Sequence, residues 1–238
     1  MKEEPGKIRY WILRKLFGHE IEAHIREYYK KQEKQKKGTL YESILYTVND
    51  CLASCDDDDE KEIILTYILE ALVSDLCGTT QNEGLIYHTR YADSPFPLYY
   101  FNGIKEVSLI KGTADIELSQ VSLYVRLHRY THLTPLLMKL RTSRFEYDDT
   151  NHMATYFDDL NLCHVYNGNH SIAAGKYYNK GRITAKLVHM NDLYQKFTTD
   201  GQEWIEIDSD RRTAVSDYRC AAIFSVAKLR NTIRKQNH

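Results

Sequence analysis

Apolar side chains recur at a helical period in the first part of the chain. Over 7–37 they return near every 3.6 positions, which predicts an amphipathic helix with a lysine-rich end before Gly38. Thr39 and Glu42 have the spacing of a capping box, in which a hydroxyl and a carboxylate satisfy amides at a helix start. The pattern therefore predicts that one helix ends at Gly38 and that a second begins at Thr39.

Four consecutive aspartates, Asp56–Asp59, precede an apolar stretch that predicts a third helix ending near Gly78. Carboxylate oxygens are ligands for hard cations, so this run raises the question of a metal site. However, no glycine-bearing calcium loop follows it, and the helix dipole favours negative charge at a helix start. We interpret the aspartates as a helix start.

Turn-forming residues, among them Pro95 and Pro97, become frequent after residue 78 and predict a connecting segment. Beyond this segment, strands are predicted at 105–116, 160–166, 182–190 and 203–207, helices at 134–142, 171–179 and 216–236, and a strand or a helix at 119–129. The predicted fold class is α+β, with a helical region at 1–78, a connecting segment at 79–103, an α/β domain at 104–200, and a terminal strand and amphipathic helix at 201–238.

The composition adds limits on the class of partner. The chain has 32 Lys and Arg against 33 Asp and Glu, so its overall charge gives no general attraction to nucleic acid. Five cysteines are an odd number, and with no signal peptide ahead of them they predict a reducing, cytoplasmic location. No stretch approaches the roughly 18 apolar residues of a membrane-spanning helix, so no membrane partner is expected.

The segment Asn-Gly-Asn-His-Ser at 167–171 lies between a predicted buried strand and a predicted short helix. Gly168 permits a sharp turn, and Ser171 is a candidate helix cap. Amides at a helix start lack internal partners, and the helix dipole adds partial positive charge there. The segment therefore predicts a site that can hold an anion.

The order of strand, Asn167–Ser171, Ala173-Ala174 and second strand resembles the D-G-x-H-R … A-A signature of the ParB/sulfiredoxin-like fold. The segment IKEVSLIKG at 104–112 is similar to the first strand of those domains, and the resemblance covers roughly 104–190. It implies a small mixed-sheet domain with a phosphate site in a bacterial or phage protein. Members include nucleotide-binding DNA-partition proteins, ATP-dependent sulfinic-acid reductases and nucleases.

Two residues depart from that signature, and a third departs from the reductases among its members. Ser171 stands where the family usually has arginine, and serine cannot grip phosphate oxygens in a fork, which puts phosphoryl transfer in doubt. Asn167 replaces the common acid and removes a metal or ribose contact. Asn169 replaces the reductase cysteine, so sulfinic-acid reduction is the least favoured activity.

We expect the anionic part of a ligand to lie on the backbone of Gly168 to Ser171, with His170 donating a hydrogen bond or acting as an acid or base. Arg126 and Arg129, with His128, are candidates for the missing positive charge, although a solvent-facing basic patch explains them equally well. The candidate phosphate-binding set is Asn167, Gly168, Asn169, Ser171, Arg126 and Arg129, and the candidate catalytic residue is His170.

Other chemistry has less support. His152, His164 and His170 lie near several aspartates and could indicate a metal nuclease, but the spacing of these residues matches no metal-binding motif. A divalent cofactor is therefore possible without support from ligand spacing, and we assign no metal ligands. His164 and Cys163 are expected in a buried strand, and Asn151-His152 in an Asx-type turn.

Two functions from different classes follow. The first is binding of a nucleotide or nucleic-acid phosphate at 167–171, with phosphoester hydrolysis of the nuclease or nucleotidase type if the protein is an enzyme. The alternative is a non-catalytic protein-interaction module that keeps a degenerate ParB-like fold and uses its helices and 19 tyrosines to hold a protein partner. The sequence gives no indication of oligomeric state.

Overall fold

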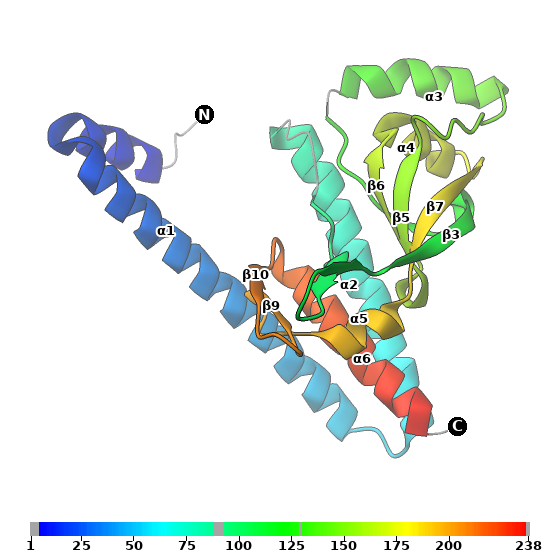
Figure 1. Ribbon diagram of the computed structural model, residues 1–238. Helices are drawn as coiled ribbons and strands as arrows, with labels where there is room; N and C mark the ends of the chain where they lie inside the picture. Colours follow the sequence, from blue (N-terminus) through cyan, green and yellow to red (C-terminus); the bar gives the residue numbers. More distant parts are fainter. Residues whose placement is uncertain (1–4, 88–92, 129, 237–238) are drawn as a thin grey trace.

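The computed structural model describes residues 5–87, 93–128 and 130–236 (Figure 1). It has the predicted α+β class: two long helices first, then mixed sheets with short helices, then a terminal helix. Helix α1 spans Pro5–Ala53, α2 spans Asp58–Tyr87 and α6 spans Tyr218–Gln236. Helix α6 lies between α1 and α2 and packs on both, so it joins the two N-terminal helices into one helical core (Figure 1).

Helix α1 is continuous, so the predicted end at Gly38 and the predicted cap at Thr39 are both wrong. The Thr39 hydroxyl donates to the Gln35 carbonyl one turn earlier, at 3.1 Å, and caps no helix start. Two residues later, buried Tyr41 packs in the main core, and its hydroxyl lies 2.9 Å from the Ser225 hydroxyl of α6. A helical glycine costs only about 1 kcal/mol relative to alanine, which tertiary packing of this kind can override.

Helix α2 begins where the aspartate run predicted a helix start. The Glu60 amide donates to the Asp57 carboxylate at 2.8 Å, and the Asp56 amide donates to the Glu60 carboxylate at 2.9 Å. This arrangement is close to a capping box with Asp57 in the capping position, except that Glu60 accepts from the amide of Asp56, the residue before the cap. The three acidic residues of the first turn, Asp58, Asp59 and Glu60, complement the helix dipole.

The end of α2 differs from the prediction, because the helix passes Gly78 and continues to Tyr87. Its last turns pack on strand β4 (Ser122–Tyr124) and the segment that follows it. The Asp58–Gly84 stretch is also long and apolar enough to cross a membrane, which corrects the expectation from composition, although a core helix of a soluble protein passes the same test. Leu65, Leu69 and Leu76 of this helix are buried in the main core.

Within the described residues, the main sheet has five strands in the order β3-β7-β5-β6-β4. It is mixed, because β4–β6 and β5–β7 pair in parallel while β3–β7 and β5–β6 pair antiparallel. The other strands and α-helices are β1 Tyr99–Phe101, β2 Glu106–Ser108, β3 Ile110–Glu117, α3 Leu133–Thr142, β5 Met153–Phe157, β6 Leu162–Asn167, α4 Asn169–Tyr177, β7 Arg182–Val188, α5 Met190–Lys196, β8 Phe197–Thr199, β9 Glu203–Glu206 and β10 Arg212–Ala214.

Alternate residues of the sheet belong to two different cores. Phe157 and Leu162 lie opposite each other on β5 and β6 and join the core of α1, α2 and α6. Ala154 and Val165, also a pair across these strands, belong to a second core that includes Ile172 of α4. The sheet therefore separates the long helices from α4, and the turn before α4 lies on the side away from the helical core.

Candidate functional site

The segment 167–171 forms a tight strand-to-helix turn, as the sequence predicted. Strand β6 ends at Asn167, Gly168 has a left-handed φ of 73°, and α4 begins at Asn169. A Cβ on Gly168 would lie 2.7 Å from Cδ2 of His152 and 2.8 Å from the Asn151 carbonyl oxygen. Both the backbone conformation and the close approach therefore require glycine.

Ser171 lies inside the first turn of α4 and is not its cap, because the capping position is Gly168. Its hydroxyl donates back to the Gly168 carbonyl at 3.0 Å, and the Ile172 amide donates to the same carbonyl at 3.0 Å. The amides of Asn169, His170 and Ser171 precede that first internal bond. They are donors at the positive end of the helix dipole.

A cavity of about 560 Å³ lies at this turn. All five residues from Asn167 to Ser171 line it. The opposite wall comes from α3 and its flanking segments, which bring two cationic side chains, Lys139 and Arg144. The further lining residues are His128, His132, Leu136, Leu140, Phe145, Glu146, Asn151, His152 and Tyr166.

His170 is held by a main-chain carbonyl. Its Nε2 lies 2.5 Å from the His128 carbonyl oxygen, which can only accept, so Nε2 carries the proton and Nδ1 carries the lone pair in the neutral ring. Burial lowers the pKa of His170 below its usual value of 6.5, the bond to the His128 carbonyl opposes this, and the nearby His132 adds to it. At neutral pH the ring is therefore a base and not a cation.

His152 and Ser171 form a second hydrogen-bonded pair in the cavity wall. Nδ1 of His152 accepts from the Asp148 amide at 3.0 Å, so the ring proton is on Nε2, which lies 2.8 Å from the Ser171 hydroxyl oxygen. The Ser171 hydrogen goes to the Gly168 carbonyl. His152 thus donates to Ser171 and cannot take its proton, which excludes a serine nucleophile activated by histidine in this arrangement.

An Asx-type turn occurs at Asp148, three residues before Asn151, where the sequence predicted one. The Asp148 carboxylate accepts from the Thr150 amide at 3.0 Å and from the Thr150 hydroxyl at 2.7 Å. This turn presents the Asp148 amide that fixes the His152 tautomer. The ring of His152 stacks on Phe145 with the centroids 5.0 Å apart.

Asn169 has one satisfied and one unsatisfied side-chain atom. Its Nδ2 donates to the Arg126 carbonyl at 3.0 Å, which fixes the orientation of the amide. Its Oδ1 is buried without a hydrogen-bond partner among the described residues, although the residue is only 8% exposed. A buried acceptor of this kind costs free energy unless a donor reaches it. Asn169 is among the residues that line the cavity, but the Oδ1 atom itself is buried.

The described residues assign neither predicted arginine to the cavity wall. The guanidinium of Arg126 bonds to the Glu83 carboxylate of α2 at 2.7 Å, and its side chain is absent from the cavity lining. Arg129 lies outside the described residues. The cations that do line the cavity, Lys139 and Arg144, were missed because only the tertiary fold brings α3 over the turn.

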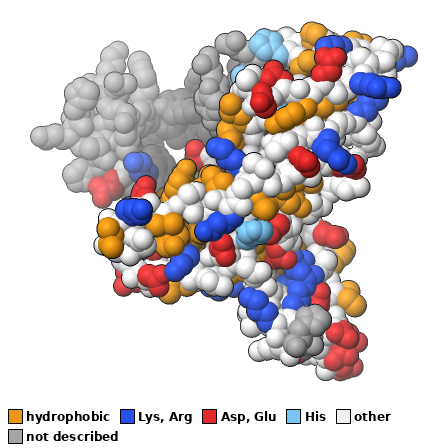
Figure 2. Space-filling view, turned by 45° about the vertical axis from the view of Figure 1, so that its right-hand side comes forward, with side chains coloured by type: hydrophobic (Ala, Val, Ile, Leu, Met, Phe, Trp, Pro, Cys, Tyr) orange, Lys and Arg blue, Asp and Glu red, His pale blue; other side chains and the backbone are white. Residues whose placement is uncertain are grey.

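The surface charge and the arrangement of candidate metal ligands bear on the class of ligand. On the face drawn in Figure 2, basic and acidic side chains are interspersed and do not form one basic surface. Among the described residues, no group of three or more His, Cys, Asp or Glu is arranged to hold a metal ion. His164 and Cys163 are buried at 4% and 0% exposure, as predicted for core residues of β6.

The His152 pair predicts a pH effect on stability. Burial lowers the pKa of His152 below 6.5, and the charge of Asp148 opposes this shift. A histidine with a depressed folded-state pKa contributes stability fully above the unfolded-state pKa, and that contribution is lost as the pH falls below it. We expect the free energy of unfolding to fall between pH 7 and pH 5 more steeply in the wild type than in His152→Gln, measured by urea denaturation. Equal slopes would contradict this role of His152.

Comparison with known proteins identifies a family. A family model described as "Family of unknown function (DUF6710)" matches residues 24–237. The matched range includes the turn, the cavity and all three long helices except the start of α1. No curated protein and no solved structure matches the chain.

Proposed function

Because the chain belongs to the DUF6710 family, whose function is unknown, we propose a function from the site itself: the turn 167–171 binds the phosphate group of a nucleotide or nucleic acid. The observation that supports this proposal is the cavity of about 560 Å³ at the start of α4. Ligand sites usually have volumes of roughly 300–1,000 Å³. The free amides of the first turn and the side chains of Lys139 and Arg144 supply donors for an anion on two sides of it.

The Oδ1 of Asn169 lacks a hydrogen-bond partner among the described residues, so a ligand that carries a donor as well as an anion is favoured once a shift at the start of α4 exposes this atom. A phosphate oxygen accepts from the amides but gives nothing to Oδ1, whereas a ribose hydroxyl or a base amine can donate to it. A nucleotide carries both kinds of group. The neutral Nδ1 of His170 is a second acceptor in the same wall.

If the protein is an enzyme, we propose phosphoester hydrolysis with His170 as the general base. Nδ1 takes a proton from a water molecule while the water oxygen bonds to phosphorus, and the ester oxygen leaves with a proton from solvent. Such a base typically contributes about 10²–10⁴-fold to a rate. Ser171, in place of the arginine of the ParB/sulfiredoxin-like signature, leaves Lys139 and Arg144 to stabilise the developing charge.

The alternative function, a non-catalytic protein-interaction module, is supported by a different observation. Three large side chains of the long helices, Tyr46, Ile63 and Tyr67, are 74%, 68% and 71% exposed. Exposed aromatic and aliphatic side chains are typical of protein-binding surfaces. In this reading the cavity holds no ligand.

We propose a reducing, cytoplasmic location for either function. All five cysteines are free. Burial raises the pKa of the Cys77 and Cys163 thiols to about 12, so these two remain protonated and unreactive at neutral pH.

The test of phosphate binding is a thermal-shift panel of inorganic phosphate, nucleoside monophosphates and short oligonucleotides. At a ligand concentration of about 100 times Kd, we expect Tm to rise by about 5–10 °C in the wild type. His170→Ala should lose most of that rise, because it removes the Nδ1 acceptor and frees the start of α4. His189→Ala is the matched control, since His189 bonds to Asp158 and does not line the cavity.

The outcome of this panel decides between the two functions. A shift with a nucleotide that is kept in His189→Ala and lost in His170→Ala supports phosphate binding. If no phosphate ligand shifts the wild type, the proposal fails. Loss of protein-partner capture in Tyr46→Ala or Tyr67→Ala would then support the interaction module.

A further inference from the structure

We propose that helix α2 positions the phosphate-binding turn through Glu83 and Gly84, acting on the segment 126–128. This inference rests on the proposed function of the turn and assigns a role to residues that do not line the cavity. Two side chains at the start of α4 depend on this segment. Asn169 donates to the Arg126 carbonyl at 3.0 Å, and His170 donates to the His128 carbonyl at 2.5 Å.

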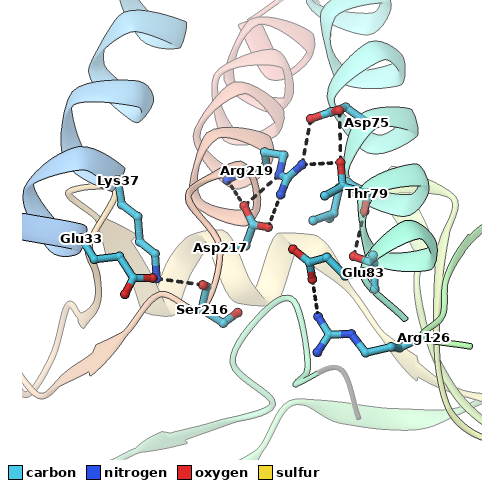
Figure 3. Close-up of polar contacts among 11 residues, drawn as sticks. Glu33, Lys37, Asp75, Thr79, Glu83, Arg126, Ser216, Asp217 and Arg219 are labelled. Atoms are coloured by element: carbon cyan, nitrogen blue, oxygen red, sulfur yellow. Dashed lines mark hydrogen bonds and ion pairs between the residues drawn. The ribbon is translucent and has the colours of Figure 1, made fainter. Parts of the chain in front are cut away.

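The first link between α2 and the segment is an ion pair. The Glu83 carboxylate lies 2.7 Å from the Arg126 guanidinium, as the close-up in Figure 3 shows. The Arg126 side chain is 19% exposed and that of Glu83 is 37% exposed, so the pair is partly shielded from water. Arg126 thus accepts from Asn169 with its main-chain carbonyl and pairs with Glu83 through its guanidinium. We interpret it as a positioning residue and no longer as a phosphate ligand.

The second link is a backbone contact at Gly84. A Cβ on Gly84 would lie 2.5 Å from the Leu127 carbonyl oxygen and 2.8 Å from the Leu127 amide nitrogen. These are backbone atoms of a buried residue, so they cannot move aside as the end of a flexible side chain can. The helix and the segment therefore touch directly at the residue between the two carbonyls that hold Asn169 and His170.

Helix α2 is the fixed partner in this contact. Its buried residues Leu69, Val73 and Leu76 belong to the main core. One face of the helix carries Asp75, Thr79 and Glu83 at intervals of four residues. Arg219 at the start of α6 bonds to Asp75 at 3.1 Å and to Thr79 at 2.6 Å, one turn before Glu83 reaches Arg126 (Figure 3). A change at the Glu83 end is therefore expected to move the segment 126–128 and the turn, and not the helix.

The sharpest test compares two glycines of the same helix. A Cβ on Gly78 meets nothing within 4 Å, whereas one on Gly84 meets Leu127. Gly78→Ala should raise Tm by about 2–4 °C through helix propensity alone. Gly84→Ala gains the same propensity but overlaps the segment, so it should displace both carbonyls and weaken nucleotide binding by about tenfold or more.

The direct readout is the side-chain Nε2–H proton of His170 in NMR spectra without ligand. In the wild type and in Gly78→Ala we expect a signal that exchanges slowly with water, because the His128 carbonyl holds this proton. Gly84→Ala should lose or shift it. A wild-type-like signal in a folded Gly84→Ala would overturn the proposal.

Glu83→Gln tests the same idea with a smaller change, should Gly84→Ala fold poorly. Loss of a partly exposed ion pair is expected to weaken nucleotide binding about threefold to fivefold and to speed exchange of the His170 proton. The exchanged pair Glu83→Arg with Arg126→Glu should restore both, and Glu70→Gln, an exposed residue of α2, should change neither. Failure of the exchanged pair to restore the proton signal would count against positioning by the ion pair.

These experiments distinguish a failure of phosphate binding at the turn from a failure of positioning by α2. If the wild type shows the protected His170 proton, and Gly84→Ala loses it, positioning by α2 stands even when no nucleotide binds. In that case only phosphate binding fails. If nucleotides bind equally well to Gly78→Ala and Gly84→Ala, phosphate binding stands and positioning fails.

Discussion

Gly168→Val is expected to abolish nucleotide binding and to lower the free energy of unfolding by about 2–5 kcal/mol. Gly168 has a φ of 73°, which costs a branched side chain roughly 1–2 kcal/mol. The added Cβ would also lie 2.7 Å from the His152 ring and 2.8 Å from the Asn151 carbonyl oxygen. Relief of that overlap must shift the start of α4 and the amides that face the cavity. Urea denaturation and nucleotide titration measure the two effects.

Gly103→Val is the matched control for this substitution. Gly103 also has a left-handed φ, of 90°, but a Cβ there meets nothing within 4 Å. It should therefore show only the backbone cost of about 1–2 kcal/mol and bind nucleotide normally. Nucleotide binding by Gly168→Val at wild-type affinity would show that the geometry of the turn is not required.

The turn itself could be predicted from the sequence because its determinants are local. An apolar run ends at Asn167, Gly168 supplies the left-handed residue, and small residues follow in α4. Strands β3, β6 and β7 of the main sheet were predicted for the same reason, since alternation and turn residues act over a few positions. Strand β4 lies in the segment left between strand and helix, and β5 was not predicted as a strand. The sequence predicted Ser171 as the cap of α4, whereas the capping residue is Gly168. The prediction differs because both glycine and serine are common at helix caps.

The ends of the long helices could not be predicted locally. Gly38 and Gly78 are helix-breaking by propensity, yet both lie inside helices. The atoms nearest to a Cβ on Gly38 belong to the flexible side chain of Gln202, which can move aside, and a Cβ on Gly78 meets nothing within 4 Å, so steric contact is not the reason for glycine at either position. Packing on α6 and on β4 extends both helices past these points.

The cavity wall opposite the turn was also beyond prediction from spacing. Lys139, Arg144 and His132 are more than 20 residues away from the turn along the chain and meet it only because α3 packs on α4. Arg126, a predicted phosphate ligand, does not line the cavity and instead pairs with Glu83. Its partner Glu83 is on α2, which the sequence predicted to end before that residue.

Asp159→Ala is expected to lower the free energy of unfolding by about 3–5 kcal/mol, because it leaves a buried cation without its carboxylate. Asp159 lies in the short 3₁₀-helix Asp158–Leu160 after β5 and accepts from Arg230 at 3.0 Å and from Arg234 at 3.3 Å. It also accepts from the Tyr194 hydroxyl at 2.9 Å. Arg230 is only 6% exposed, so water cannot replace the lost partner. Urea denaturation gives the size of the loss.

The double variant Asp159→Ala with Arg230→Met separates the unpaired charge from other losses. An apolar side chain of similar length removes the buried charge, so the double variant should be more stable than Asp159→Ala alone. Asp208→Ala is the control at an exposed ion pair, with Lys196, and should cost at most about 1 kcal/mol. If the double variant is the less stable of the two, the cost of Asp159→Ala comes from lost packing and hydrogen bonds, since Arg230 also donates to the Asp159 main-chain carbonyl at 2.9 Å.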